Sequence, residues 1–501
     1  MYKCKIITML MFILLVLSAC KMQPTTAIAN ATPGPVTREQ VLPTKPALTA
    51  TQVAITETPI LPTATETSAS PTPTDTPAPQ GLNPSGPYVM FAAHSGIWIT
   101  NPDGSFATRL LDYDMTSNLD LHPMVSPNGD RLAMVVNNEG GLDLVMVEIP
   151  SGESETIVHL LDASEGIYDP ISPNSFALYA IRDYGSIAWQ PPDGRFLAFT
   201  GAIEGPTSDL YLYDTVTKKI TQLTSGPAQA VLPVWSPDGQ YILHFGVSWR
   251  PPFGGAIGGA NYLDGVWAVR ASDGEIITLP VNKGSNPHFL GWEDDTHYIT
   301  YDSGECSSEN LHTVDIISGE VSQLMEASFY HYIARSPVNG AILFSSDVGC
   351  PDSLGAGVFI LPSGQADPIK LHDIKAWTVE WMPESGIFDA YPEGLFSVDG
   401  QMYYASPVYD KSFKPAISKQ GYQAWEVIEN FQGRVMSRVP GKDWRTIMGG
   451  KIDELIWDPV EGKTLLIALS NGSIYAATYP DFAPHQMSSV EDSVFQVLWT
   501  P

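Results

Sequence analysis

A turn motif that recurs along the chain constrains its fold more than any other feature. Each copy has a large residue, one further residue and, in seven of the eight copies, a Pro, followed by a tight turn and an apolar strand. The copies begin at Val125, Trp189, Trp235, Trp292, Arg335, Trp381, Trp457 and Trp499, so half of the 12 Trp share one column. Their spacings are 64, 46, 57, 43, 46, 76 and 42 residues, and the shortest intervals fit four antiparallel strands with short turns.

Residues 234–292 show the layout of one such unit. VLPVW, QYILHFGV, GVWAVRA and IITL form four strands, with SPDG and SDGE as turns between them. The pattern predicts an all-β β-propeller of eight four-stranded blades, with seven blades as the alternative because the longest intervals carry insertions. The chain ends in mid-motif at residue 501, and residues 87–111 supply three further strands. We therefore expect the C-terminal strand to close the ring beside the N-terminal strands, which removes exposed sheet edges.

The SPDG turns, the LAF-like strands after them, and the segments DLYLYD and KITQLT resemble the TolB-type, WD40-like propeller repeats of bacterial envelope proteins. The resemblance covers residues 87–501 and implies the fold, whereas such propellers serve many unrelated functions. Similar blades also occur beside the catalytic domains of prolyl-oligopeptidase relatives.

The N-terminus predicts export and lipid anchoring. Lys3 and Lys5 precede a core of twelve apolar residues, which is typical of a signal peptide and too short to cross a bilayer. The segment Leu17-Ser18-Ala19-Cys20 resembles the lipobox of bacterial lipoproteins, which implies cleavage after residue 19 and acylation (palmitate among the chains) of Cys20. An ordinary signal peptide with an incidental Cys is the alternative. We expect a membrane-anchored protein of the bacterial cell envelope, exposed outside the cytoplasm.

Residues 20–80 differ in composition from the rest of the chain. Residues 21–80 contain 15 Thr and 11 Pro and few large apolar residues, so we expect a disordered linker between the anchor and the propeller of residues 81–501. The whole chain has 26 Lys and Arg against 55 Asp and Glu, a formal charge of −29, which argues against nucleic acid as a partner. Whether the linker is glycosylated stays open.

Polar residues at the start of the first strand of several blades predict a ligand-binding mouth. Strand one lines the central channel of a propeller. Residues four and five positions before the second residue of the turn motif (Ser126 in the first copy) should therefore surround one opening. The candidates are His122, His288, His331, Trp377, Asp453 and Glu454. Two imidazoles, an aromatic ring and carboxylates suit a sugar, a peptide terminus or a metal. The favoured explanation is the simpler one, that strand ends beside a water-filled channel are often polar. We predict no metal and no cofactor.

Two cysteines remain once Cys4 leaves with the signal and Cys20 is acylated. Cys306 and Cys350 follow the second strands of adjacent blades and are 44 residues apart, close to one repeat. Because equivalent loops of neighbouring blades lie close together and the exported compartment is oxidising, we expect them to form a disulfide. Two free thiols are the alternative.

No catalytic motif is recognisable. The sequence has no G-x-S-x-G elbow, H-E-x-x-H, P-loop or EF-hand loop, and blades occupy the chain beyond the linker. We therefore expect a monomer, not an enzyme, that binds a protein, peptide or glycan through loops. The segment between residues 403 and 425, rich in aromatic residues, is one candidate surface. The alternatives are a lyase or hydrolase with its site at the channel mouth and a structural scaffold of an envelope assembly.

Overall fold

The structure is a computed structural model in which the chain is divided into two units, residues 1–74 and 75–501. The described residues all lie in the second unit: 81–112, 120–162, 173–182, 185–250, 260–280, 287–303, 308–329, 333–336, 338–346, 353–374, 376, 378–382, 387–391, 394–397, 402–405, 416–429, 432–490 and 493–500.

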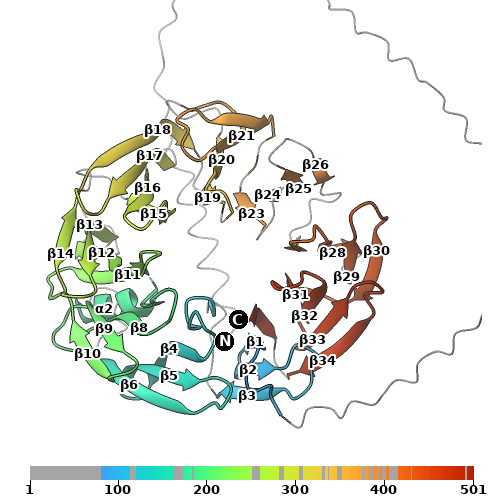
Figure 1. Ribbon diagram of the computed structural model, residues 1–501, viewed down its shortest axis with the longest axis horizontal. Coiled ribbons are helices and arrows are strands. Elements are labelled where there is room, and N and C mark those ends of the chain that lie inside the picture. The colour runs from blue at the N-terminus through green and yellow to red at the C-terminus, as the bar shows by residue number, and fades with distance from the viewer. Residues whose placement is uncertain are drawn as a thin grey trace, which may run out of the picture. The chain divides into compact units, whose positions relative to one another are not determined.

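The second unit is a β-propeller of nine blades arranged in a ring (Figure 1). Within the described residues, eight blades are four-stranded antiparallel sheets and one has three strands. Blades 1 to 3 hold β4 (Arg131–Asn138), β5 (Gly141–Glu148), β6 (Ser154–Asp162); β7 (Ile187–Trp189), β8 (Phe196–Gly201), β9 (Asp209–Asp214), β10 (Lys219–Gln222); and β11 (Gln229–Trp235), β12 (Tyr241–Arg250), β13 (Ala260–Arg270), β14 (Ile276–Leu279). Blades 4 and 5 hold β15 (Pro287–Trp292), β16 (His297–Ser303), β17 (Ser308–Asp315), β18 (Val321–Phe329); and β19 (Ile333–Arg335), β20 (Ile342–Ser346), β21 (Gly357–Leu361), β22 (Ile369–His372).

The remaining four blades complete the ring. Blades 6 and 7 hold β23 (Thr378–Trp381), β24 (Ile387–Tyr391), β25 (Gly394–Ser397), β26 (Met402–Ala405); and β27 (Ala416–Ile417), β28 (Gln423–Glu429), β29 (Gln432–Arg438), β30 (Arg445–Gly449). Blades 8 and 9 hold β31 (Ile452–Trp457), β32 (Thr464–Leu469), β33 (Ser473–Thr478), β34 (Pro484–Ser489); and β35 (Val494–Trp499), β1 (Val89–Ala93), β2 (Gly96–Thr100), β3 (Thr108–Leu111).

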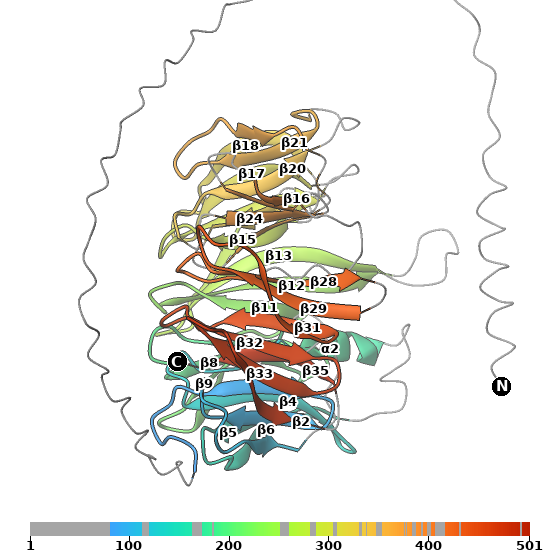
Figure 2. The ribbon, with the colours of Figure 1, turned by 90° about the vertical axis from the view of Figure 1, so that its right-hand side faces the viewer.

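Blade 9 confirms the predicted closure of the ring. Its sheet order is β3-β2-β1-β35, so the last strand of the chain pairs antiparallel with the first, from Val89 opposite Trp499 to Ala93 opposite Val494. On its other side β35 contacts β31 and β32 of blade 8 (Figure 2). Because the closing sheet joins residues more than 400 positions apart, it fixes the whole ring rather than one blade.

The turn motif shapes each blade through its polar residue and its Gly. In blade 3 the carbonyl of Ser236 accepts a hydrogen bond from Gly239 N at 2.9 Å, and the Ser236 hydroxyl accepts one from Tyr241 N at 3.0 Å. Gly239 has a φ of +68°, in the left-handed region that favours glycine. The motif therefore reverses the chain between strands one and two within a few residues.

In four blades the Trp of the motif joins the blade to the one before it. The indole Nε1 donates to the backbone carbonyl just before the motif residue of the preceding blade, at 2.9 to 3.1 Å. The pairs are Trp189 with Met124, Trp235 with Ala188, Trp381 with Ala334, and Trp457 with Ala416. The core consists of apolar clusters between facing sheets, such as Phe91 of β1 against Leu466 of β32.

The predicted count of eight blades, and the alternative of seven, is wrong. The extra blade, blade 7, lies in the 76-residue interval between Trp381 and Trp457, which the sequence suggested was an insertion. Its motif has Ile417 in place of Trp and Lys419 in place of Pro, but Ser418 and Gly421 make the same turn: Gly421 N donates to the Ser418 carbonyl at 2.8 Å. Trp425 is buried in β28, so the 403–425 segment is not a single exposed binding loop.

A true insertion occurs between blades 1 and 2. It includes the helix α2 (Pro173–Arg182), whose Leu178 and Ile181 are buried in the cluster that blades 1 and 2 share. The helix lies at one face of the ring (Figure 2). Among the described residues no helix has the length and apolar character needed to cross a bilayer.

Candidate functional site

One position of the repeat separates blade 6 from all the others. The position is the one directly before the first residue of the turn motif, for example Ala188 before Trp189. The residue there lies opposite a residue of strand two, and in all nine blades this pair falls within the described residues. Eight pairs are apolar or contain Gly: Met124/Ala133, Ala188/Ala198, Val234/Leu243, Gly291/Ile299, Ala334/Leu343, Ala416/Ala424, Ile456/Leu466 and Leu498/Met90. Blade 6 instead has Glu380 directly opposite Asp389.

Two carboxylates in this register are unfavourable for folding. Residues directly opposite each other on antiparallel strands project from the same face of the sheet, and like charges there destabilise the pair. The sheet tolerates an apolar pair at this position in the other blades, so packing does not require the acids. A costly pair that the fold does not need is a candidate functional feature.

Glu380 and Asp389 line a cavity of about 620 Å³, here called the blade 6 cavity. It extends from blade 6 past the first strands of blades 7, 8 and 9 and reaches blade 1. The other lining residues are His122, Met382, Ala416, Ile417, Ser418, Lys419, Glu454, Leu455, Ile456, Trp457, Asp458, Pro459, Leu498 and Trp499. Its volume is in the range of small-molecule and peptide side-chain sites.

Asp389 is the acid of this cavity whose pKa is raised. It is half-buried, and among the described residues its Oδ1 atom has no hydrogen-bond partner. Burial, with a further contribution from the charge of Glu380, raises the pKa of Asp389 to about 7, against the opposing effect of the Ala390 backbone N–H. Asp389 therefore gains and loses a proton close to neutral pH.

The other two acids of the blade 6 cavity have structural partners. Asp458 accepts backbone N–H bonds from Val460, Lys463 and Thr464 at 2.9 to 3.1 Å. Burial alone would raise its pKa, but backbone hydrogen bonds, from Glu461 first and then from Thr464 and Lys463, outweigh it and hold the pKa of Asp458 below its usual value. Glu454 accepts a hydrogen bond from Val497 N of blade 9 and thereby joins two blades.

The structure brings only part of the predicted mouth together. His122 and Glu454 line the blade 6 cavity. Among the described residues, no other member of the predicted set does so. Asp453 accepts a hydrogen bond from Ser470 Oγ at 2.6 Å, within its own blade, and the ring of His288 stacks on Tyr301 at 5.0 Å. His331 and Trp377 lie outside the described residues.

Glu380 and Asp389 were not among the predicted residues, although the sequence held a signal for them. The prediction considered the start of strand one, whereas Glu380 lies at its end, directly before Trp381. In the motif alignment it is the charged residue in a column of Met, Ala, Val, Gly, Ile and Leu. Asp389 likewise interrupts the apolar run IFDAY.

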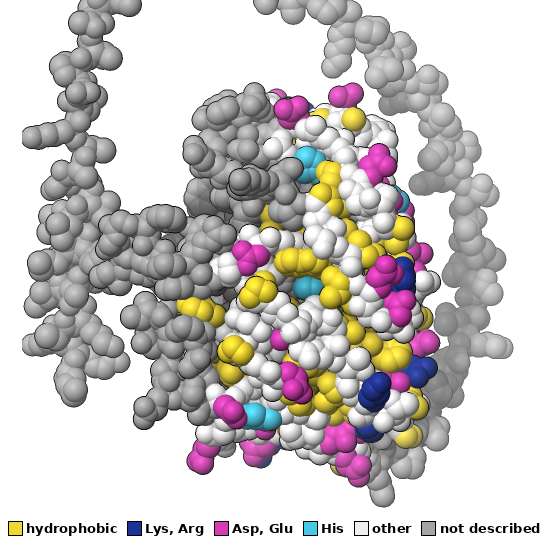
Figure 3. Space-filling model, turned by 90° about the vertical axis from the view of Figure 1, so that its left-hand side faces the viewer, with side chains coloured by type: hydrophobic (Ala, Val, Ile, Leu, Met, Phe, Trp, Pro, Cys, Tyr) yellow, Lys and Arg dark blue, Asp and Glu magenta, His cyan; other side chains and the backbone are white. Residues whose placement is uncertain are grey.

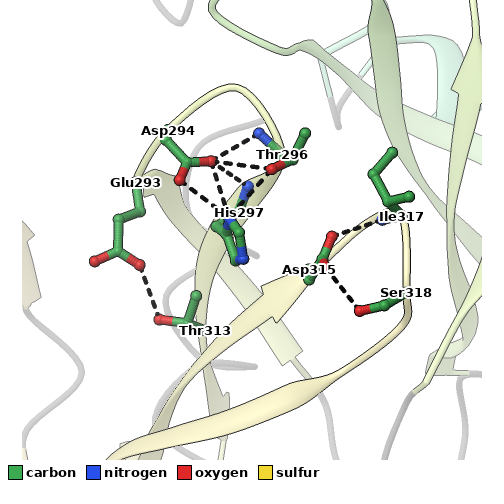
Figure 4. Close-up of polar contacts among 8 residues, drawn as sticks. All are labelled: Glu293, Asp294, Thr296, His297, Thr313, Asp315, Ile317 and Ser318. Carbon is green, nitrogen blue, oxygen red and sulfur yellow. Dashed lines mark hydrogen bonds and ion pairs between the residues drawn. The ribbon is translucent and has the colours of Figure 1, made fainter.

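Elsewhere on the propeller, acidic side chains are dispersed. Figure 3 shows one face on which Asp and Glu are scattered among apolar and neutral side chains. Many lie in turns, such as Asp294 and Asp315 of blade 4 (Figure 4), where their oxygens accept hydrogen bonds from nearby residues. Among the described residues no three His, Cys, Asp or Glu side chains are grouped in a way that could hold a metal. Cys20, Cys306 and Cys350 lie outside the described residues, so the lipid anchor and the disulfide stay predictions.

Comparison with known proteins supports the fold. No family model matches the chain. The chain is similar in structure to a eukaryotic initiation factor, with a TM-score of 0.51 and 13% identity over 83% of this chain and 98% of that one. It is also similar to dipeptidyl peptidase 4 of Porphyromonas gingivalis (TM-score 0.44, 9% identity, 83% and 60% covered) and to TolB of Acinetobacter baumannii (TM-score 0.26, 13% identity, 74% and 82% covered).

One curated protein matches in sequence. It is the uncharacterized peptidase YuxL of Bacillus subtilis (strain 168), 35% identical over 77 residues. The match spans 13% of this chain and 12% of that protein. It corrects the prediction that the chain is not an enzyme, because the relative carries the name of a peptidase and so points to catalysis.

Proposed function

We propose that the protein is a hydrolase of peptides whose active site is the blade 6 cavity. The observation that carries the proposal is the Glu380–Asp389 pair, which replaces an apolar pair in a single blade and faces a cavity. This is the enzyme alternative that the sequence left open, with the acids in different places from those expected.

Asp389 is suited to proton transfer. A general acid or base works best when its pKa is close to the working pH, and burial beside Glu380 brings the pKa of Asp389 to about 7. In peptide hydrolysis, protonated Asp389 would donate its proton to the leaving nitrogen as the C–N bond breaks. Glu380 would act through Asp389 by keeping that proton in place near neutral pH.

Hydrolysis also needs a group that accepts the proton of the attacking water. The oxygen of water bonds to the carbonyl carbon, and its proton must go to a base on the cavity wall. The apolar lining from Met382, Ile417 and Leu455 limits the water around the scissile bond and strengthens the electrostatic effect of the acids. Peptide is proposed as the substrate because the sequence relative is named a peptidase.

The location of this activity is a second part of the proposal. Acylation of Cys20 would hold the propeller at the outer face of a membrane, with residues 21–80 as a spacer. Substrates would then be peptides of the cell envelope or the surroundings. Metabolic labelling with palmitate, compared between the wild type and Cys20→Ala, tests this part separately.

The test is cleavage of a mixed peptide library by the purified protein, followed by mass spectrometry. We expect cleavage by the wild type and a loss of at least about 100-fold in Asp389→Asn, because a positioned general acid contributes factors of that size. Asp315→Asn, which removes a charge from an exposed turn, is the matched control and should cleave normally. No cleavage by the wild type, or equal cleavage by Asp389→Asn, would contradict the proposal.

A further inference from the structure

His122 and Asp120 form a hydrogen-bonded pair where blade 1 meets the blade 6 cavity. The Asp120 Oδ1 atom lies 3.0 Å from the ring Nδ1 of His122 and accepts the backbone N–H of His122 at 3.0 Å. Of the two residues, His122 lines the cavity. The imidazole is thus held from one side by a carboxylate while its ring belongs to the cavity wall.

This contact assigns the two ring nitrogens of His122. Burial alone would raise the pKa of Asp120, but hydrogen bonds from Gln496 and from the backbone and ring of His122 outweigh it and lower the pKa. Asp120 is therefore ionised at neutral pH and can only accept. Gln496 Nε2 also lies 3.3 Å from Nδ1, but the Asp120 contact is shorter and Gln496 Nε2 donates to Asp120 at 3.0 Å, so we assign the N–H of the neutral ring to Nδ1 and the lone pair to Nε2.

The last strand of the chain holds this pair in position. Gln496 of β35 accepts the Leu121 backbone N–H through Oε1 at 2.6 Å and donates through Nε2 to Asp120 Oδ1 at 3.0 Å. Gln496 occupies the same repeat position as Glu454, which reaches the backbone of blade 9 in the same way. Closure of the ring therefore positions both Asp120 and His122.

We propose that His122 is a second catalytic residue of the blade 6 cavity, the base that takes a proton from the attacking water, with Asp120 and Gln496 as positioning residues. The inference rests on the proposed hydrolase function. Water bonds through oxygen to the carbonyl carbon and gives its proton to Nε2 of His122. The C–N bond then breaks, and the leaving nitrogen takes the proton of Asp389.

The proton balance closes with solvent. After product release His122 returns its proton to water and Asp389 regains one. Among the described residues, the charged groups that line the same cavity are Glu380, Asp389, Lys419, Glu454 and Asp458. Lys419 donates to the Pro459 carbonyl at 2.9 Å, and Glu454 and Asp458 accept backbone hydrogen bonds. His122 is thus the nitrogen base of this lining, and Glu380 is the competing base that the test must exclude.

The first measurement is the tautomer of His122 by ¹⁵N NMR of the full-length protein at pH 8. We expect the Nδ1–H form in the wild type and a mixture of both forms in Asp120→Asn. A wild type that is mainly in the Nε2–H form would overturn the inference, because that ring has no lone pair available to water. This readout does not depend on activity.

The second measurement is the pH profile of kcat for peptide cleavage. His122→Gln should lower kcat by at least about 100-fold at every pH of the profile, with little change in KM. His159→Gln is the matched control: His159 also pairs with an Asp through Nδ1, at 2.6 Å from Asp143, but it does not line the cavity. Normal unfolding curves confirm that each variant is folded.

The outcomes separate the two proposals. Cleavage that is lost in Asp389→Asn but kept in His122→Gln overturns the role of His122 and leaves the hydrolase intact. Cleavage that is lost in Glu380→Gln and kept in His122→Gln assigns the base to Glu380 instead. No cleavage by the wild type overturns both proposals.

Discussion

Blades 4 and 6 both place acids close together, but the acids differ in their hydrogen-bond partners and in the direction of their pKa shifts. In blade 4, Asp294 Oδ1 accepts from the backbone N–H groups of Thr296 and His297, both at 2.8 Å, and lies 3.0 Å from the His297 ring (Figure 4). In blade 6, Asp389 faces Glu380 and keeps one oxygen that has no partner among the described residues.

The pKa shifts of the two regions are opposite. Burial works against the charge of Asp294, but the hydrogen bonds from Thr296 and His297 outweigh it and lower its pKa. Burial and the charge of Glu380 act together on Asp389 and raise its pKa to about 7. The comparison shows that acidic residues stabilise a turn when their oxygens accept hydrogen bonds from nearby groups. An acidic residue whose oxygen has no such donor is a candidate catalytic group.

The largest predicted effect is on how stability depends on pH. Because the pKa of Asp389 is raised from its ordinary 3.8 to about 7, the folded protein binds this proton more tightly than the unfolded chain. The stability associated with it is complete below pH 3.8 and is lost as the pH rises to about 7, a change of about 4 kcal/mol. Asp389→Asn should therefore become more stable relative to the wild type across that window, as measured by urea unfolding.

The matching variant in blade 4 should behave in the opposite way. Asp294 has a lowered pKa, so its contribution is present above pH 3.8 and is lost as the pH falls through the folded pKa. Asp294→Asn should be less stable than the wild type at neutral pH, and the difference should shrink in acid. If both variants shift in the same direction with pH, the distinction between the two regions fails.

The next effect concerns the coupling between Glu380 and Asp389. Glu380→Gln removes the charge that is the second cause of the raised pKa of Asp389, while burial, the larger cause, remains. We expect the pKa of Asp389 to fall but to stay above 3.8, because desolvation persists. The measurement is the carboxyl ¹³C titration of Asp389 by NMR, and the basic limb of the proposed cleavage profile should move to lower pH with it. An unchanged titration would show that the two carboxylates do not interact.

Much of the fold could be predicted from the sequence because the repeat has a local cause. The turn needs a polar residue to cap it and a Gly at positive φ, and in four blades the Trp donates a hydrogen bond to the preceding blade. Most copies of the repeat are therefore recognisable by themselves. Blade 7 was not recognised in the sequence because Ile417 and Lys419 replace the Trp and the Pro of the motif. Ser418 and Gly421, which make the turn, are too common in loops to identify it alone.

The site was only partly predictable for a different reason. The position of His122 and Glu454 follows from the register of strand one, which the motif fixes. The importance of Asp389 depends on desolvation and on the residue opposite it, and neither is visible until strand two is paired with strand one. Asp453 shows the converse, since its neighbour Glu454 faces the cavity while its own carboxylate is held by Ser470.

The smallest effect tests whether the blade 4 acids act only as turn formers. Asp294→Ala removes the acceptor of two backbone N–H groups in an exposed turn, which should cost about 1 kcal/mol, as the loss of a capping side chain does.

Asp294 also raises the pKa of His297 through a ring hydrogen bond, so His297 should titrate at lower pH in this variant. His297 stabilises the fold below pH 6.5, and this contribution is lost as the pH rises through its folded pKa, so the cost should be larger at pH 6 than at pH 9. Asp295→Ala, the exposed neighbour, is the control for urea unfolding and NMR. Equal effects of the two variants would mean that the hydrogen bonds of Asp294 do not stabilise the turn, and the contrast with Asp389 would then depend on burial alone.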